Sequence, residues 1–241
     1  MPLKRRSPGG EGRRSRMDDR APHRSTPFTL HPRSSILALV LLCLAAEPVT
    51  SKSAGYFTDF HDSTAGKVPD DLMVLNGDFT IGEDHGKKFL EVPGEPLDTF
   101  GCLFGPADFT TGQVSAMIAG QSSGKRFPEF GVGSNDTGGF KIWLLPGQSR
   151  LELRKGDETK ATATYSWRSA AWTHIEIRVE RAGEKHWRVE GKAWPDGAAE
   201  PTQWMLSIDE TEAPAPGRAS VWGAPYSGKP IRFTNLAVDQ P

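Results

Sequence analysis

The sequence has only two cysteines in 241 residues, and one of them, Cys43, lies inside its longest apolar run. If the chain is cleaved after that run, Cys102 is left alone and no internal disulfide can form. Exported proteins often depend on disulfides, so this one has to be stabilised by burial, for which about 190 residues are sufficient in one domain. No histidine stands beside Cys102, so we expect a packed thiol and not a nucleophile.

Short catalytic motifs are missing as well. The sequence contains no Gly-x-Ser-x-Gly, no His-Glu-x-x-His and no phosphate-binding P-loop. The glycine-rich run from Gly131 to Asp136 is not followed by a helical pattern, so we expect a turn there. His61 stands between two aspartates, and a polar turn is the expected reason for it.

Only one apolar run, Ile36 to Ala46, is longer than a strand. Its eleven residues are too few to cross a bilayer, which needs about 20. Residues 1–33 carry nine basic and three acidic side chains, and a basic region before a short apolar core is typical of a secretory signal peptide. We therefore predict a basic leader and signal peptide over residues 1–51, one domain over residues 52–241, and a secreted, periplasmic or cell-surface location. An uncut signal anchor is the alternative, and Met17 is an alternative start.

Basic charge is scarce outside this leader. The whole chain has a net charge of −1, whereas residues 51–241 carry about −6. A mildly acidic domain without a basic stripe argues against nucleic acid as a partner.

What the chain does have is alternation of apolar and polar residues with a period of two, which indicates strands with one buried face. It is clearest in residues 171–194, which predict a long hairpin around Gly183. Opposite charges across a ladder stabilise it and like charges destabilise it, which selects one register. That register sets Ala182 against His186 and opposes Glu180 to Arg188, Arg178 to Glu190, Glu176 to Lys192, Val179 to Val189 and Ile177 to Gly191. We expect the matched charges to form a solvated outer face.

A dozen or so short strand patterns follow one another, separated by Gly, Pro, Asn and Asp, which predicts an all-β sandwich or barrel. Their order resembles the concanavalin A-like lectin/glucanase jelly roll in its LamG-like form, over about residues 55–240. The residues that carry the resemblance are Asp59-Phe60, Trp172 to Ile177 with Trp187-Arg188-Val189, Ala193-Trp194, and Ile231 to Val238. The resemblance implies an all-β, two-sheet antiparallel jelly-roll sandwich.

Catalytic residues of this fold are not matched in the sequence. Family 16 glucanases of the fold carry Glu-x-Asp-x-x-Glu, in which two carboxyl groups act as nucleophile and acid/base, and no such string occurs. The chain is also distantly similar to exported 3-keto-disaccharide hydrolase-type domains, but it has Gly66 to Leu72 where that group has its opening motif.

A candidate binding face comes from positions that alternate with core residues on their strands: Glu129, Lys141, Trp143, Ser220 and Trp222. In the resembling lectins and glucanases one concave sheet takes a glycan. The resemblance therefore implies sugar stacking on Trp143, Trp222 and Tyr226, and hydroxyl contacts from Glu129, Asn135, Asp136 and Lys141. The alternative is that both tryptophans are packed under a loop; the other five, Trp167, Trp172, Trp187, Trp194 and Trp204, are expected at strand ends and in the core.

The resemblance also implies calcium near the termini as the one candidate cofactor, with Asp59 and Asp239 as its ligands. Together these features predict an exported carbohydrate-recognising module without catalysis, whose partner is a glycan or polysaccharide. One alternative is a glycan-active hydrolase or lyase that uses Glu129, Asp136 and His61. The other is a structural module of the cell envelope with a protein partner.

Overall fold

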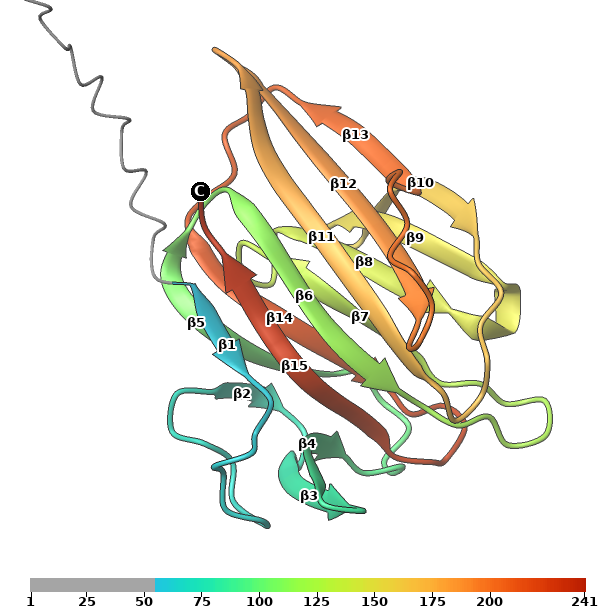
Figure 1. The fold of residues 1–241 in the computed structure, drawn as a ribbon. Helices are drawn as coiled ribbons and strands as arrows, with labels where there is room; N and C mark the ends of the chain where they lie inside the picture. Colours follow the sequence, from blue (N-terminus) through green and yellow to red (C-terminus); the bar gives the residue numbers. More distant parts are fainter. Residues whose placement is uncertain (1–54) are drawn as a thin grey trace, which may run out of the picture. The chain divides into compact units, whose positions relative to one another are not determined.

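The computed structural model describes residues 55–241, and the predicted leader with Cys43 and Met17 lies outside the described residues. The described chain forms two antiparallel sheets that are stacked face to face (Figure 1). The prediction of an all-β sandwich is therefore confirmed. Among residues 55–241, no helix has the length and apolar character that crossing a membrane would require.

Sheet A has eight strands, in the order β13-β12-β11-β6-β15-β4-β3, with β1 also paired to β15. Their bounds are β1 Tyr56–Thr58, β3 Thr80–Asp84, β4 Lys87–Val92, β6 Gly112–Ala119, β11 Trp172–Gly183, β12 His186–Pro195, β13 Leu206–Glu210 and β15 Ile231–Asp239. Sheet B has seven strands, in the order β10-β9-β8-β7-β14-β5-β2. Their bounds are β2 Met73–Asn76, β5 Phe100–Phe109, β7 Glu129–Ser134, β8 Phe140–Leu145, β9 Arg150–Lys155, β10 Glu158–Thr164 and β14 Gly217–Ala224.

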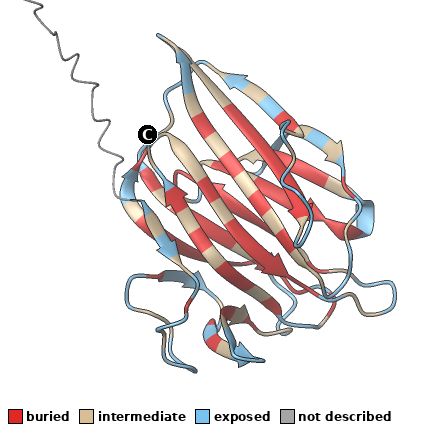
Figure 2. Ribbon diagram, in the orientation of Figure 1, coloured by how far each residue is buried: buried red, intermediate tan, exposed pale blue. Residues whose placement is uncertain are grey.

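The core lies between the two sheets and is built from the apolar half of each alternating pattern. Sheet A contributes fully buried residues such as Ile175 and Ile177, and sheet B contributes Phe130, Ile142 and Leu153. Figure 2 shows the resulting bands of buried residues along the strands. Each such side chain contributes about 1.5–3 kcal/mol on burial, and the outward half of each pattern is left free for other roles.

Cys102 belongs to this core, as predicted. Its side chain is fully buried and forms no disulfide. Burial, with the negative charge of Asp71 nearby, raises the pKa of the Cys102 thiol to about 12. The thiol is therefore protonated at physiological pH and is not a nucleophile.

The register of the β11–β12 hairpin agrees with the prediction from charge. Five of the six predicted pairs are present: Glu176 with Lys192, Ile177 with Gly191, Arg178 with Glu190, Val179 with Val189 and Glu180 with Arg188. The turn is different, because the ladder shifts between Arg181 and Gly183, and Gly183 faces His186 where Ala182 was expected. A one-residue bulge beside the turn takes up this shift, so the register of the rest of the two strands is unchanged.

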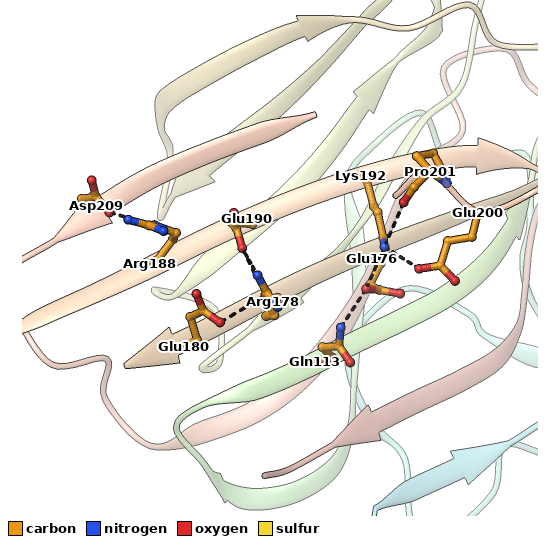
Figure 3. Close-up of polar contacts among 10 residues, drawn as sticks. All are labelled: Gln113, Glu176, Arg178, Glu180, Arg188, Glu190, Lys192, Glu200, Pro201 and Asp209. Atoms are coloured by element: carbon orange, nitrogen blue, oxygen red, sulfur yellow. Dashed lines mark hydrogen bonds and ion pairs between the residues drawn. The ribbon is translucent and has the colours of Figure 1, made fainter. Parts of the chain in front are cut away.

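The outer face of this hairpin is solvated, as the sequence predicted, only toward the turn, where the side chains of Glu180 and Arg188 are 38% and 41% exposed. Farther from the turn, residues 196–205, between β12 and β13, lie against this face, and the side chain of Lys192 is only 7% exposed. Figure 3 shows the ammonium group of Lys192 between Glu176 and Glu200. The ring of Trp204 lies 4.3 Å from the same nitrogen and 4.8 Å from the guanidinium of Arg178.

Four of the other five tryptophans lie at strand ends or against the core, as predicted: Trp172 begins β11, Trp187 and Trp194 lie near the two ends of β12, and Trp167 packs against the core. Trp204 lies instead in the connection before β13. The ring of Trp194 stacks on His174 at 4.9 Å, and the ammonium of Lys87 lies 4.5 Å from the ring of Trp172. Polar and cationic partners of this kind keep large aromatic side chains on the outer face of sheet A.

Candidate functional site

The outer face of sheet B has a trough along its central strand. Trp143 on β8 and Trp222 on β14 are both paired with Gly131 of β7, which therefore lies between them. In the next row, Lys141 and Ser220 are both paired with Gly133. Because β7 has no side chains at these two rows, side chains of β8 and β14 approach one another above it: a Cβ atom on Gly133 would lie 2.5 Å from Ser220 Oγ and 3.1 Å from Lys141 Cγ.

A cavity of about 640 Å³ opens over this trough. Its volume falls in the range of about 300–1,000 Å³ that small-ligand sites have. Five of the seven residues predicted to bind ligand line it: Glu129, Lys141, Trp143, Trp222 and Tyr226. The structure thus brings together residues that stand up to 97 positions apart in the sequence.

The three aromatic residues differ in how much of each ring a ligand can reach. Trp143 is only 5% exposed, and its indole N–H donates to Glu129 Oε2 at 3.1 Å. Trp222 is half-buried; its indole N–H donates to Ser220 Oγ at 2.8 Å. Tyr226 is 38% exposed, and its hydroxyl lies 3.3 Å from Thr99 Oγ1. Tyr226 and the open part of Trp222 are therefore the rings available for stacking, whereas Trp143 is packed into the wall.

The cavity also contains a half-buried cation. Lys141 Nζ lies 4.2 Å from the centre of the Trp222 ring, an attractive cation–π distance. Burial lowers the pKa of Lys141; Asp157 acts against this shift and Arg154 adds to it. No carboxylate of residues 55–241 comes within ion-pair distance of the Lys141 ammonium group.

Behind Trp143, one buried carboxylate organises two arginines. Glu152 is paired with Trp143 in the ladder and accepts hydrogen bonds from Arg154 Nε at 2.7 Å and Thr159 Oγ1 at 3.1 Å. Arg150 Nη2 lies 2.5 Å from its other oxygen. Burial alone would raise the pKa of Glu152, but the hydrogen bonds and charges of Arg154, Thr159 and Arg150 outweigh it, so the pKa is lowered.

Replacing Glu152 by glutamine is therefore expected to destabilise the protein by about 1–2 kcal/mol at pH 7, since two cations lose their carboxylate. A lowered pKa contributes stability above the unfolded-state value, and this contribution is lost as the pH falls through the folded-state value. The difference between the variant and wild type should accordingly shrink below about pH 4.5. Urea unfolding at pH 7 and pH 4 measures it, and a difference that grows toward acid would contradict the account.

The other two predicted ligand residues do not line the cavity. Asn135 and Asp136 form the turn after β7, both with positive φ, at 61° and 59°. The Asn135 amide donates to the carbonyls of Phe109 and Ala215 at 3.2 and 2.9 Å, and Asp136 Oδ1 accepts the Arg218 N–H at 2.7 Å. Both side chains thus hold the turn to neighbouring backbone, which is a common use of Asn and Asp in turns.

The candidate calcium ligands do not meet. Asp59 follows the end of β1, and Asp239 ends β15. Because Tyr56 faces Val238 and Thr58 faces Leu236, the two aspartates lie at opposite ends of this ladder, about 13 Å apart along it. Among residues 55–241, no three His, Cys, Asp or Glu side chains gather in a way that could hold a metal ion.

The hydrolase alternative needs Glu129, Asp136 and His61 in one site, and only Glu129 lines the cavity. His61 is exposed in the turn after β1, where its backbone N–H donates to Asp59 Oδ1 at 2.9 Å. A polar turn, as expected, accounts for this histidine.

Sequence reasoning missed Thr99, Arg154 and Asp157, all of which line the cavity. Arg154 could have been found, because Leu151 and Leu153 are core residues and the alternation on β9 places Arg154 on the same face as Lys141. Thr99 and Asp157 lie in connections beside strands, where no periodic pattern indicates which way a side chain points.

No protein-family model matches the sequence, and no curated protein matches it in sequence. Among solved structures, Crh5 transglycosylase in complex with NAG is similar with a TM-score of 0.53 and 13% identity, covering 78% of this chain and 85% of that chain. A mutant of alginate lyase Aly36B in complex with alginate trisaccharide has a TM-score of 0.50 and 9% identity, covering 78% and 98%. The carbohydrate-binding module CBM66 from Bacillus subtilis has a TM-score of 0.49 and 9% identity, covering 70% and 96%. The described chain therefore has the concanavalin A-like jelly-roll fold that its sequence resembles.

Proposed function

We propose that this protein is an exported, non-catalytic module that binds carbohydrate in the cavity on the outer face of sheet B. The observation that carries the proposal is the composition of this one cavity. It combines two reachable aromatic rings, Trp222 and Tyr226, with the polar groups of Glu129, Lys141 and Asp157. A sugar ring presents an apolar C–H face and a rim of hydroxyls, and such a mixture of rings and polar groups is complementary to both.

Similar structures support the same class of ligand. Two of them are described as complexes with NAG and with alginate trisaccharide. Their identity to this chain is at most 13%, so they support the choice of carbohydrate as ligand class and say nothing about which residues bind.

The ionisation of Glu152 and the hydrogen bond that Glu129 accepts favour binding without turnover. Glycoside hydrolysis needs a carboxylic acid that can protonate the leaving oxygen. Glu152 is held ionised by Arg150 and Arg154, and its pKa is lowered, so it is a poor proton donor. Glu129 already accepts the indole N–H of Trp143.

Replacing Tyr226 by alanine is expected to weaken binding of the best oligosaccharide about two- to tenfold, because one stacking ring contributes about 0.5–1.5 kcal/mol. A glycan array first identifies that oligosaccharide, and isothermal titration then compares the variants. Phe57→Ala is the matched control, since Phe57 is an exposed aromatic residue on β1 of sheet A, and its binding should equal that of wild type.

Failure of the folded wild-type protein to bind any glycan on the array would overturn the proposal and favour a structural module with a protein partner. The hydrolase or lyase alternative is tested with the bound glycan, by assays for new reducing ends, unsaturated sugars and 3-keto sugars. Turnover that disappears in Glu129→Gln would replace binding by catalysis as the function.

A further inference from the structure

Lys141 is unusual among the lysines of the described residues that are not fully exposed. Lys88 donates to the carbonyls of His61 and Ser63 at 2.9 and 2.7 Å, and Lys155 lies 2.9 Å from a carboxylate oxygen of Glu210. Lys192 has Glu176 and Glu200. Lys141 contacts the Trp222 ring and has no hydrogen-bond acceptor among residues 55–241.

An ammonium group that has lost part of its water normally regains hydrogen bonds from a partner in the protein. The Trp222 ring attracts the charge of Lys141 but accepts none of its three N–H groups in an ordinary hydrogen bond. The unused donors belong to a residue that lines the cavity. They are therefore available to a group carried by a ligand.

The surroundings of Lys141 make that end of the cavity positive. Arg154 faces Lys141 directly across the β8–β9 ladder, whereas Arg150 is paired with Leu145, four residues farther along β9. One carboxylate, Glu152, is shared by the two arginines, so Lys141 is not neutralised by it. Of the charged residues that line the cavity at this end, Lys141 and Arg154 are positive and Asp157, at the exposed rim, is negative.

The acidic end of the cavity is separate. Glu129 lies two rows away along β7 from Gly133, which is paired with Lys141, a separation of about 13 Å between the two backbone positions. Its carboxylate accepts the Trp143 indole N–H, and Tyr226 lines the same cavity. The cavity thus offers the ammonium group of Lys141 at one end, and away from it the carboxylate of Glu129 and the exposed ring of Tyr226.

We infer that the cavity is selective for an anionic saccharide, a sugar that carries a carboxylate or a sulfate ester, and that Lys141 binds this acid group. The inference rests on the proposed carbohydrate-binding function and adds the chemical class of the ligand. In the complex, the acid group accepts the free N–H groups of Lys141, while the sugar ring lies toward Tyr226 and the open part of Trp222.

The test uses pairs of oligosaccharides that differ only in charge. Oligogalacturonate is compared with its full methyl ester, and a sulfated galactan oligosaccharide with its desulfated form, by isothermal titration. The wild-type protein should bind one of the acidic forms at least about tenfold more tightly than its neutral partner, since a charge-assisted hydrogen bond contributes more than a neutral one. The preference should weaken with added salt. Whichever arm shows the larger preference identifies carboxylate or sulfate as the acid group.

Lys141→Gln should remove about tenfold of the affinity for the acidic form and change the affinity for the neutral form less than about threefold. Lys141→Arg should keep the preference, which shows that a loss in the glutamine variant does not come from unfolding. Lys87→Gln is the matched control, because Lys87 also lies over a tryptophan, Trp172 at 4.5 Å, but on sheet A. It should leave both affinities unchanged.

Equal binding of acidic and neutral forms by the wild-type protein would overturn the inference and leave carbohydrate binding standing. So would a preference that survives unchanged in Lys141→Gln. If neither form of either pair binds, and the glycan array is also negative, the proposed function itself fails.

Discussion

Replacing Lys192 by methionine is expected to lower the free energy of unfolding by about 3 kcal/mol at neutral pH, because it removes one partner of a buried ion pair. Lys192 Nζ lies 3.6 Å from Glu176 Oε1 and also hydrogen-bonds to Glu200 (Figure 3). The Glu176 side chain is 13% exposed, so it has little water to replace the lost cation. Gln113 Nε2, at 3.1 Å, would remain as its neutral donor.

The pH dependence of this loss gives a second readout. Burial raises the pKa of Glu176 above its ordinary value of 4.5, and Lys192 is the first influence that opposes the rise. Between the two values the folded protein binds more protons at Glu176 than the unfolded chain does, so this group makes unfolding harder as the pH falls. Without Lys192 the pKa of Glu176 rises further. The difference in stability between wild type and Lys192→Met should therefore shrink as the pH falls toward 4.5.

Urea unfolding at several pH values measures both effects. Lys160→Met is the matched control: Lys160 lies 2.8 Å from Glu158, which is largely exposed, and such surface pairs contribute only about 0–1 kcal/mol. Adding Glu176→Gln to Lys192→Met should recover much of the loss, since no uncompensated charge is then buried. A loss below about 1 kcal/mol, or one that does not change with pH, would show that Glu176 is hydrated in the folded protein.

This cluster also shows what charge pattern alone can predict. The register of β11 and β12 follows from opposing Arg178 to Glu190 and Glu176 to Lys192, because both partners lie within one hairpin. The burial of the same charges depends on residues 196–205, whose sequence has no periodicity and whose path is set by contacts such as Trp204 over Lys192. Local pairing could be read from the sequence, whereas the covering segment could not.

The candidate site likewise contains residues whose position could be predicted from the sequence and residues whose position could not. Glu129, Lys141, Trp143 and Trp222 were predictable because alternation places each on the face opposite its core neighbours. Asn135 and Asp136, predicted as ligand residues, lie outside the cavity in a turn, where no such alternation indicates the direction of a side chain. Their backbone contacts with segments 26 to 82 positions away in sequence, such as Asp136 with Arg218, arise only in the fold.

Gly131 contributes to the site through its lack of a side chain, and replacing it by alanine is expected to lower stability by about 3 kcal/mol or more. A Cβ atom at this position would lie 1.9 Å from the backbone oxygen of Ile142 and 3.1 Å from Cα of Trp143. Backbone atoms of β8 cannot rotate away as a side chain can, so β7 and β8 would have to separate at the middle of sheet B. Overpacking of this kind typically costs 1–3 kcal/mol and sometimes more.

A general effect of alanine works in the opposite direction and is smaller. Replacing glycine by alanine restricts the unfolded chain and stabilises a protein by about 0.4–1 kcal/mol where the fold accepts the methyl group. Gly138 provides that case, because it lines the same cavity but a Cβ atom there meets nothing within 4 Å. Gly138→Ala should therefore leave stability unchanged or slightly raised, and the contrast with Gly131→Ala isolates the clash with β8 from the change of residue type.

Gly131→Ala also tests whether ligand binding depends on the close contact between β7 and β8. A methyl group on Gly131 would press on the β8 backbone beside Trp143, and both Trp143 and Trp222 are paired with this glycine in the ladder. Displacement of β8 would also move Lys141, which lies two residues from Trp143 on that strand. Saccharide affinity should accordingly fall in Gly131→Ala even under conditions where the variant remains folded. If Gly131→Ala unfolds at the wild-type urea concentration and binds as wild type does, then the close contact between β7 and β8 is not a feature of the protein in solution.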